Sequence, residues 1–391
     1  MHKIYSRPRL KIPKIVIHMK NNKERSGKRA KILIIVFIAF MTLAFIISAV
    51  TPIFDTLCKN EAISMATIIA NNKATEVMAK HTYDELFSIE KDESGNIKMI
   101  KTISIVSLSS GILGEDFVKF ERDIGLKRLE EMGVRVKFMP NSCKGVEYLK
   151  EHPEKRAEDL LEALGDSDTD MILCAIGGDD TYRLAPYLFE NDALKNAVRN
   201  KIFLGFSDTT LNHFMLHKVG MNTFYGQAFL PDICELSCDM LPYTQKYFEE
   251  LLNTGTIKQI TPSGTWYESR EKFDESQVGV PLKEHKNSGF ELISGKAQFS
   301  GKILGGCIDS IYDMFDGERY EDMPAVCEKY GLFPSLDDWK DKILLLESSE
   351  ELMPPEKYAK ALDYLKNTGM FGVLSGIIAG KPMNGKYHDE Y

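Results

Sequence analysis

The chain lacks the cysteine patterns of metal and redox sites. It has only seven cysteines in 391 residues, and no two of them form a CxxC pair, which argues against a zinc ribbon or a thioredoxin-like centre. Their odd number and wide spacing favour reduced thiols in a domain of the cytosolic type. Glycine and proline are ordinary in number, which excludes collagen-like and low-complexity chains.

Acidic residues outnumber basic residues outside the N-terminus. The net charge is −8, yet the first 31 residues hold eleven lysines and arginines against one acid, so they carry +10 and the other 360 residues carry −18. An acidic body repels phosphate backbones, and we therefore expect no nucleic-acid partner.

One long hydrophobic run follows the basic tail. Residues 32–50 contain 17 apolar residues out of 19, and as a helix they would span about 28 Å, close to the hydrocarbon thickness of a bilayer. A cleaved signal peptide has a shorter apolar region that ends at small residues. We predict a single transmembrane helix over 32–50, with residues 1–31 as a cytoplasmic tail.

The segment 51–100 has its own pattern. An amphipathic helix is predicted over 59–80, and the turn DESGN at 92–96 separates two short apolar runs, as in a β-hairpin. Together with the tail and the membrane helix, this segment resembles the N-terminal part of the YunB-like sporulation proteins. The resemblance ends near residue 101. It implies a membrane-anchored, non-catalytic sporulation or envelope protein as one candidate function.

From residue 101 onward, buried strands alternate with amphipathic helices. The predicted strands are 103–108, 134–139, 171–176 and 201–206, and the predicted helices between them are 115–131, 155–164 and 181–190. This alternation predicts an α/β fold with a parallel, helix-covered sheet. Ligands of such sheets bind beyond the carboxyl ends of the strands.

Two of these strand ends carry polar or glycine-rich turns. The strand 171–176 runs into Gly177-Gly178, where backbone N–H groups can approach a substrate oxygen, although no dinucleotide fingerprint is present. The strand 201–206 runs into Ser207, Asp208 and Thr209. A serine at a strand-to-helix turn can act as a nucleophile, but all three residues are also ordinary helix caps. The local sequence alone favours the cap.

Residues 101–391 resemble the LD-carboxypeptidase family of serine peptidases, which includes muramoyltetrapeptide carboxypeptidases and microcin C self-immunity peptidases. Seven blocks match the family in order, among them Gly205–Thr210 (GFSDTT), Thr223–Gly226 (TFYG), Gly301–Ile308 (GKILGGCI) and Ile343–Glu350 (ILLLESSE). Cys307 stands where the family usually has asparagine. The resemblance implies two domains, an N-terminal α/β domain over 101–240 and a smaller, mixed α/β domain over 255–391.

The resemblance also implies roles for single residues. Ser207 would be the nucleophile, the backbone N–H groups of Asp208 and Gly178 would form the oxyanion hole, and Glu347 would orient the base. Trp266 matches an aromatic residue that stacks on substrate, and packing within the second domain is its alternative role. The implied substrate is the L,D amide of a murein peptide or a peptidyl-nucleotide amide. No metal or organic cofactor is implied, and a homodimer stays open.

The base histidine of the family has no counterpart in this sequence. In the family it lies in an FGH turn well after the GKP strand, and His388 matches an aromatic loop position instead. His213 and His217, four residues apart, either pair toward a metal or face solvent or the domain interface. His285 lies in a polar loop without a motif. We therefore expect a truncated C-terminal domain and an inactive or weak peptidase, or a substrate-binding pseudoenzyme.

The two halves of the chain predict different compartments. The anchor makes a single-pass membrane protein with its body across the membrane, whereas members of the resembled family usually act in the cytoplasm. The switch near residue 100 and the missing turn together predict two joined gene fragments.

Overall fold

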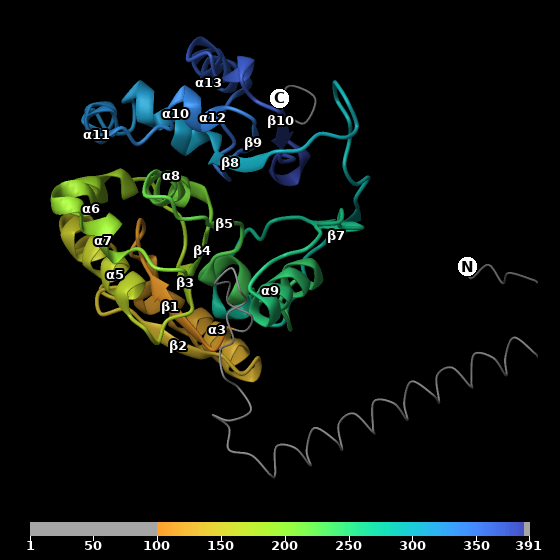
Figure 1. The fold of residues 1–391 in the computed structure, drawn as a ribbon. Coiled ribbons are helices and arrows are strands. Elements are labelled where there is room, and N and C mark those ends of the chain that lie inside the picture. Colours follow the sequence, from red (N-terminus) through yellow and green to blue (C-terminus); the bar gives the residue numbers. More distant parts are fainter. Residues whose placement is uncertain (1–99, 387–391) are drawn as a thin grey trace, which may run out of the picture. The chain divides into compact units, whose positions relative to one another are not determined.

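The computed structural model describes residues 100–386 (Figure 1). The predicted membrane helix over 32–50, the basic tail and nearly all of the segment 51–100 lie outside this range, as does His388. Within the range, no helix has the length and apolar character needed to cross a membrane.

A five-stranded parallel sheet carries the first half of the described chain. Its strands are β1 (Thr102–Val106), β2 (Arg135–Phe138), β3 (Met171–Cys174), β4 (Ile202–Gly205) and β5 (Phe224–Tyr225). They lie in the order β2-β1-β3-β4-β5. The first four are the strands predicted from the sequence, and each ends one or two residues earlier than predicted because its last residues already belong to the following turn.

Helices cover both faces of this sheet, as parallel sheets require. The α-helices are α3 (Lys119–Glu131), α4 (Val146–Glu151), α5 (Pro153–Gly165), α6 (Ala185–Phe189), α7 (Ala193–Ala197), α8 (Thr210–Lys218) and α9 (Pro242–Thr254). Short turns of other helix types are η1 (Ile112–Gly114), η2 (Asp116–Val118), η3 (Thr181–Leu184), η4 (Glu190–Asp192), η5 (Ser207–Thr209) and η6 (Phe229–Ile233). Figure 1 shows α3 and α9 on one side of the strands and α5 to α7 on the other.

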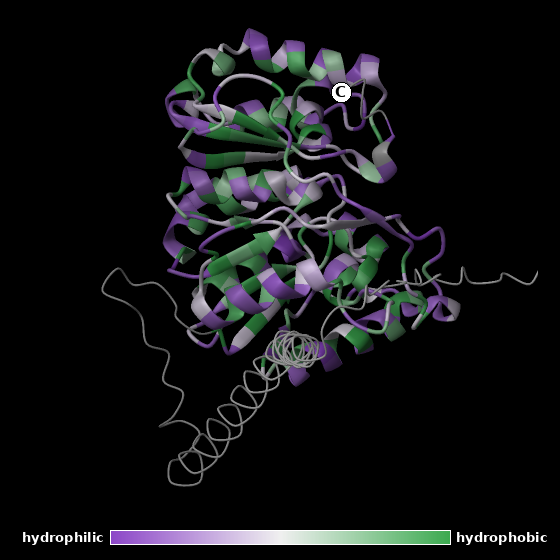
Figure 2. Ribbon diagram, turned by 90° about the vertical axis from the view of Figure 1, so that its right-hand side faces the viewer, coloured by the Kyte–Doolittle hydropathy of each residue, from purple (hydrophilic) through white to green (hydrophobic). Residues whose placement is uncertain are grey.

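The strands are apolar on both faces, and each face has its own core. Ile103 and Ile105 of β1 pack in a cluster with Phe248 of α9. The alternate residue Val106 packs in a second cluster with Phe214 of α8. Figure 2 shows the resulting concentration of hydrophobic residues on the strands. This two-sided burial explains why the sequence shows continuous apolar runs instead of an alternating pattern.

The second half contains a smaller parallel sheet in the order β10-β9-β8. Its elements are β8 (Lys302–Cys307), α10 (Ile308–Asp316), α11 (Met323–Tyr330), α12 (Leu336–Trp339), β9 (Lys342–Glu347), α13 (Pro355–Asn367), η8 (Met370–Gly372), β10 (Gly376–Ala379) and η9 (Met383–Gly385). Leu304 and Leu344 join the core cluster of α8. The expected α/β fold, with a parallel sheet and a smaller C-terminal part, is therefore confirmed. The last strand β10 is largely exposed.

A two-stranded antiparallel hairpin connects the two halves. It consists of β6 (Thr265–Tyr267) and β7 (Glu284–Lys286), with η7 (Glu275–Gln277) in its long loop. The buried side chain of Arg270 fastens this loop to the first half, because its Nη2 donates to Glu235 Oε1 at 2.5 Å and to Ser237 Oγ at 2.8 Å.

Candidate active site

Ser207 lies at the sharp turn between β4 and the helix η5–α8. Its φ is +60°, a left-handed conformation that residues other than glycine rarely adopt. The Ser207 N–H donates to the Tyr225 hydroxyl at 3.0 Å, and the side chain is partly exposed. Within the described residues, no hydrogen bond occupies the Ser207 hydroxyl. The turn thus has the strained backbone expected of a nucleophile elbow.

The helix-cap alternative for this serine finds no supporting hydrogen bond. Both η5 and α8 begin without a side-chain cap. Thr209 Oγ1 instead donates to the Phe206 carbonyl at 2.7 Å, and Thr210 Oγ1 donates to the Ser207 carbonyl at 2.6 Å. These two backward hydrogen bonds hold the turn closed from the helix side.

The Gly177-Gly178 turn packs directly against Ser207. A Cβ at Gly177 would lie 2.7 Å from Ser207 Oγ and 3.5 Å from the Asp208 nitrogen, so only glycine fits there. A Cβ at Gly178 would overlap Ser109 Oγ. Asp208 is the second residue of the helix, and its N–H has no partner inside the helix. The two predicted oxyanion-hole residues therefore belong to neighbouring turns at the same sheet edge.

Buried polar contacts fix the glycine turn in place. The Asp208 carboxylate accepts from Ser109 Oγ at 2.5 Å and from the Thr181 N–H at 2.9 Å. Burial raises the pKa of Asp208 to about 6. On the other side, the buried Arg156 donates to Asp180 Oδ1 at 2.5 Å. The turn is thus held by charged side chains from both α5 and η5.

Glu347 ends β9 in the second half, opposite Cys307 of β8. Its Oε1 accepts from the Tyr225 hydroxyl at 2.5 Å. Burial raises the pKa of Glu347, and the hydrogen bonds from the Tyr225 hydroxyl and the Ser207 N–H oppose that rise. Glu347 therefore faces Ser207 and does not end in solvent, and the two predicted catalytic residues meet through Tyr225.

Close approach of the two halves makes this meeting possible. A Cβ at Gly306 would lie 2.5 Å from both Thr210 Oγ1 and Tyr225 Cε2, so β8 can touch the elbow only because it carries glycine there. The Cys307 N–H donates to Thr210 Oγ1 at 3.0 Å. In the GKILGGCI block, Gly306 is thus explained by packing against the serine turn, whereas Gly305 lies against the backbone of Leu345 in β9.

Trp266 lies on the hairpin and stacks on a histidine. It is the cross-strand neighbour of His285, with ring centroids 4.3 Å apart and planes 16° apart. His285 Nε2 lies 2.6 Å from Glu268 Oε1. The ring contact of Trp266 therefore lies within the hairpin. Among the described residues, no hydrogen bond or ring contact joins Trp266 to Ser207 or Glu347.

The four histidines in the described range are engaged away from the Ser207 hydroxyl. His213 is buried, with Nδ1 2.7 Å from Thr223 Oγ1 and Nε2 3.0 Å from the Gly205 carbonyl. The expectation that it faces solvent or a domain interface was wrong, because its ring packs between β4 and Tyr225. His217 Nε2 lies 3.5 Å from Asp338, and His152 contacts Glu154.

No group of three or more potential metal ligands occurs in the part of the chain that the structure describes. The pair of His213 and His217 does not come together at a metal site, since the two side chains contact different partners. All six described cysteines are unpaired.

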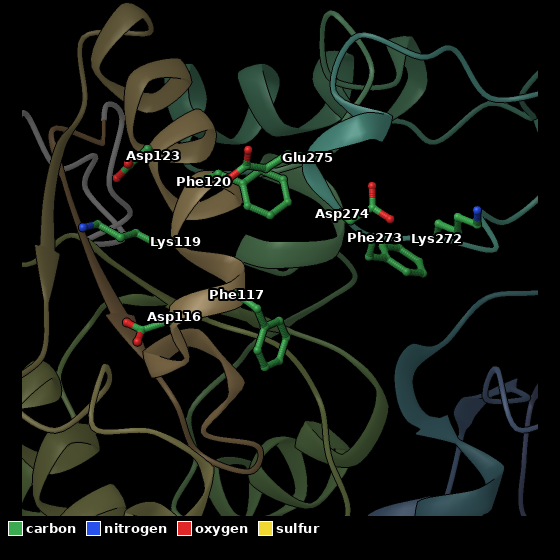
Figure 3. Close-up of a pocket in the computed structure, with 9 residues that line it drawn as sticks. All are labelled: Asp116, Phe117, Lys119, Phe120, Asp123, Lys272, Phe273, Asp274 and Glu275. Carbon is green, nitrogen blue, oxygen red and sulfur yellow. The ribbon is translucent and has the colours of Figure 1, made fainter.

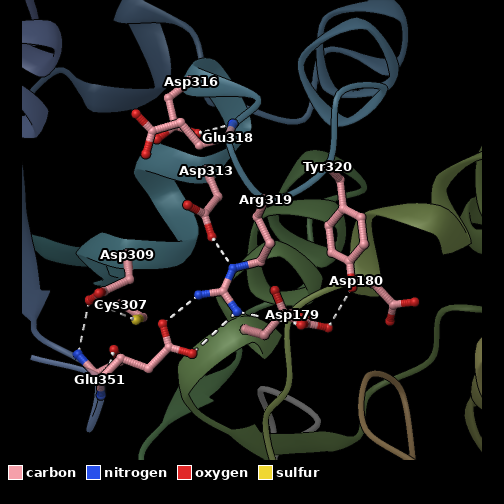
Figure 4. A network of polar contacts seen from close by, with 12 residues as sticks. Asp179, Asp180, Cys307, Asp309, Asp313, Asp316, Glu318, Arg319, Tyr320 and Glu351 are labelled. Carbon is pink, nitrogen blue, oxygen red and sulfur yellow. Dashed lines mark hydrogen bonds and ion pairs between the residues drawn. The ribbon is translucent and has the colours of Figure 1, made fainter. Parts of the chain in front are cut away.

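A polar network next to the glycine turn links the two halves (Figure 4). The Arg319 guanidinium lies 3.4 Å from Asp179, 3.2 Å from Asp313 and 2.5 Å from Glu351. The Tyr320 hydroxyl also donates to Asp179, at 3.1 Å. Three carboxylates surround the Arg319 guanidinium, and one of them, Asp179, directly follows Gly178.

A separate surface hollow of about 730 Å³ lies between η2–α3 and the hairpin loop (Figure 3). Exposed Phe117 and Phe273 contribute to its lining together with charged side chains. None of the predicted site residues lines it.

Sequence reasoning missed the residues that connect the predicted ones. Tyr225 is part of the TFYG block, yet nothing in the local sequence pairs it with Glu347, 122 positions away. The Asp208 side chain was considered only as a cap, although it braces the glycine turn. The one available signal for Tyr225 was its place in the TFYG block, which contains the short strand β5 beside the serine strand β4.

Comparison with known proteins shows the family of the chain. Residues 103–226 match the model of the LD-carboxypeptidase N-terminal domain, and residues 300–390 match that of the LD-carboxypeptidase C-terminal domain. A crystal structure of an MccF-like protein from Streptococcus pneumoniae in complex with AMP is 58% identical, with a TM-score of 0.74, over 75% of this chain and 85% of that one. The chain belongs to the LD-carboxypeptidase family.

Curated LD-carboxypeptidase relatives are more distant. The microcin C7 self-immunity protein MccF of Escherichia coli is 27% identical over 58% of this chain and 60% of its own length. A probable murein peptide carboxypeptidase of Bacillus subtilis is 26% identical over 66% of each chain. The chain thus spans about 60 to 66% of the length of these two relatives.

Proposed function

We propose that this LD-carboxypeptidase family member is a serine amide hydrolase with Ser207 as its nucleophile. One observation carries the proposal: a serine with left-handed backbone conformation is packed against a glycine turn and joined to a half-buried carboxylate through Tyr225. Strain and buried charge of this kind are concentrated at catalytic sites.

The reaction would proceed through an acyl-enzyme. The Ser207 hydroxyl loses its proton to a base as its oxygen bonds the amide carbon, and the carbonyl oxygen becomes an oxyanion. The N–H groups of Asp208 and Gly178 would stabilise that oxyanion. The amine then leaves with a proton from the same base, and water hydrolyses the ester. Glu347 would orient the base and stabilise its protonated form.

Two substrate classes suit this chemistry. The similarity to a murein peptide carboxypeptidase supports the L,D bond before the last residue of a murein tetrapeptide. The AMP complex of the pneumococcal protein supports a peptidyl-nucleotide amide, with Trp266 as a stacking surface for the base. One face of the Trp266 ring stacks on His285, and stacking of an aromatic base on the indole would contribute about 1–3 kcal/mol.

Binding of substrate without turnover is the second candidate function. It is favoured because none of the four described histidines contacts Ser207. A serine hydroxyl is a weak nucleophile until a base removes its proton. Such a pseudoenzyme would retain the binding residues, Trp266 included, and lose the turnover.

For the residues outside the described range we retain the membrane proposal. Residues 32–50 would anchor the chain, and the basic tail would stay in the cytoplasm. If the full-length protein is released from membranes by a carbonate wash without detergent, the anchor does not exist. A sporulation phenotype of a deletion strain, without any change in murein peptides, would favour the non-catalytic envelope protein.

A fluorophosphonate probe tests the catalytic proposal. We expect covalent labelling of the full chain that is lost in Ser207→Ala and kept in Ser349→Ala, a serine whose hydroxyl lies outside the elbow. Release of D-alanine from a murein tetrapeptide and hydrolysis of an acylated aminoacyl-adenylate then identify the substrate. AMP binding without Ser207-dependent labelling would support the pseudoenzyme, and labelling that survives Ser207→Ala would exclude Ser207 as the nucleophile.

A further inference from the structure

Tyr225 connects the two halves of the proposed active site through one oxygen atom. Its hydroxyl accepts the Ser207 N–H at 3.0 Å and donates to Glu347 Oε1 at 2.5 Å. Thr210 Oγ1 lies 3.3 Å from the same oxygen. The Thr210 hydroxyl donates its own proton to the Ser207 carbonyl oxygen, 2.6 Å away. The Tyr225 proton therefore has one acceptor, Glu347.

Packing leaves this phenol little freedom to leave its position. The ring centroid of Tyr225 lies 5.2 Å from that of His213, and the backbone of Gly306 lies against Cε2 on another side. Burial and the adjacent Glu347 charge raise the pKa of Tyr225 well above its ordinary value. The hydroxyl thus stays protonated and remains a hydrogen-bond donor.

Glu347 depends on this donor because its surroundings are acidic or neutral. The structure gives Glu347 no ion pair with a lysine or arginine among the described residues. The titratable groups that influence Glu347 or pack on Tyr225 come from four elements and one loop: Asp232 of η6, Asp309 of α10, Cys307 of β8, His213 of α8, and Glu350 in the loop after β9. Three of these are further carboxylates.

We infer that Tyr225 is a positioning residue that keeps the Glu347 carboxylate ionised and fixed relative to the Ser207 turn. This inference rests on the proposed function of that site. Burial of a carboxylate without a cation favours the neutral acid, and hydrogen bonds to the ionised form oppose that preference. The Tyr225 hydroxyl supplies such a bond and links it to the backbone of the nucleophile.

Removing the hydroxyl has a consequence that depends on pH. In Tyr225→Phe the ring and its packing remain, and Glu347 loses the hydroxyl donor and keeps the hydrogen bond from the Ser207 N–H, so the pKa of the folded-state carboxyl rises further above that of the unfolded chain. A group with a raised folded-state pKa destabilises the protein progressively as pH rises from the unfolded to the folded value. The loss in free energy of unfolding caused by Tyr225→Phe should therefore be small at pH 5 and large at pH 8.

Equilibrium urea unfolding of four full-length proteins tests the inference. They are the parent chain, Tyr225→Phe, Glu347→Gln and the double variant, each followed by the fluorescence of the buried Trp339 between pH 5 and pH 8. We expect the unfolding equilibrium constant of Tyr225→Phe, relative to the parent, to grow about tenfold over this range, the equivalent of one pKa unit. In the Glu347→Gln background this growth should vanish.

Tyr182→Phe is the matched control. Its hydroxyl also donates to a carboxylate, Asp322 Oδ1 at 2.6 Å, but the Asp322 side chain is 58% exposed, so little pH dependence is expected. If Tyr225→Phe fails to fold at pH 8, recovery of its folding at pH 5 supports the inference in the same way. Equal pH dependence with glutamate and glutamine at position 347 would overturn the inference.

A labelling profile separates this inference from the proposed function. If Ser207 reacts with a fluorophosphonate, the acid limb of its pH profile should move to higher pH in Tyr225→Phe, since Glu347 must be ionised to support the base. If Ser207 does not react at any pH, the proposed function fails. The unfolding comparison still decides whether Tyr225 holds the charge of Glu347.

Discussion

Ser207 combines a polar side chain with a backbone conformation that disfavours it. At φ +60° a residue with a Cβ costs about 1–3 kcal/mol more than in the common regions, and glycine escapes most of that cost. The strained conformation is held in place because two threonine hydroxyls and the Tyr225 hydroxyl form hydrogen bonds with the backbone of the turn. Stability is thus reduced at the residue whose hydroxyl is to be exposed.

Replacing Ser207 by alanine and by glycine separates the effect of losing the hydroxyl on labelling from the effect of backbone strain on stability. Both variants should lose fluorophosphonate labelling, but Ser207→Gly should be about 1 kcal/mol more stable than Ser207→Ala, because only glycine relieves the left-handed conformation. Urea unfolding of both proteins measures the difference. Equal stability of the two would mean that the turn carries no backbone strain.

His213 provides an acid-sensitive contribution to stability. Burial lowers its pKa to about 4, whereas the unfolded chain has an ordinary histidine near 6.5. Between these values the unfolded state binds the proton and the folded state does not, so stability falls as pH drops from 6.5 to 4 by up to about 1.4 kcal/mol per pH unit. His213→Gln should flatten this slope in urea titrations, and an unchanged slope would assign the acid sensitivity to other groups.

The residue roles could be predicted only where a resemblance supplied them. Local sequence favoured a helix cap at Ser207, whereas the structure shows no side-chain cap there. His213 was expected to face solvent, the domain interface or a metal because it lies four residues from His217 on the same helix. Its burial follows from the packing of β4 and Tyr225 around it, and helix periodicity contains no information about that.

At the level of elements, the sequence predicted strands and helices well and their contacts poorly. Long apolar runs identified β1 to β4, since strands covered on both faces need apolar residues at every position. The two-residue strand β5 was missed because it is too short to show a pattern. The contact of β8 with the serine turn depends on Gly306 lying against Tyr225, which is a property of two elements far apart in the chain.

The glycine turn after β3 gives an element-scale prediction. Gly177→Ala places a methyl group 2.6 Å from Ser207 Cβ, so the two turns must separate, and Ser207 labelling should fall at least tenfold. Gly165→Ala, at the end of α5 with no atom within 4 Å of the new methyl group, is the matched control and should label normally. Full labelling of Gly177→Ala would show that the two turns need not touch.

At the scale of the whole molecule, the proposed site exists only where the two parallel sheets meet. The first sheet supplies Ser207 and the glycine turn, and the second supplies Glu347. The alternation of apolar strands and amphipathic helices predicted the first sheet, and the expectation of a second domain came only from the family resemblance. Nothing in either pattern predicted that Tyr225 and Arg319 would join them, because such long-range pairs form only after both sheets have packed.

Arg319 gives the last prediction, which concerns the joint between the halves. Its guanidinium balances Asp313, whose side chain is only 10% exposed, as well as the more exposed Asp179 and Glu351. Burial raises the pKa of Asp313 to about 6 although Arg319 lowers it. In Arg319→Gln this carboxylate loses its cation, so its folded-state pKa rises further and the variant should lose about 1 kcal/mol at pH 7, and less at pH 5.

Adding Asp313→Asn to Arg319→Gln tests the cause of that loss. An unpaired buried carboxylate is more costly than the absence of both charges, so the double variant should regain most of the stability at pH 7 and show no added pH dependence. The contacts of Arg319 to the exposed Asp179 and Glu351 should matter little at high salt, where charges are screened within about 3 Å. If the double variant is as unstable as Arg319→Gln, the arginine acts through those bridging contacts instead, and the stability difference from the parent chain should then shrink in 1 M salt.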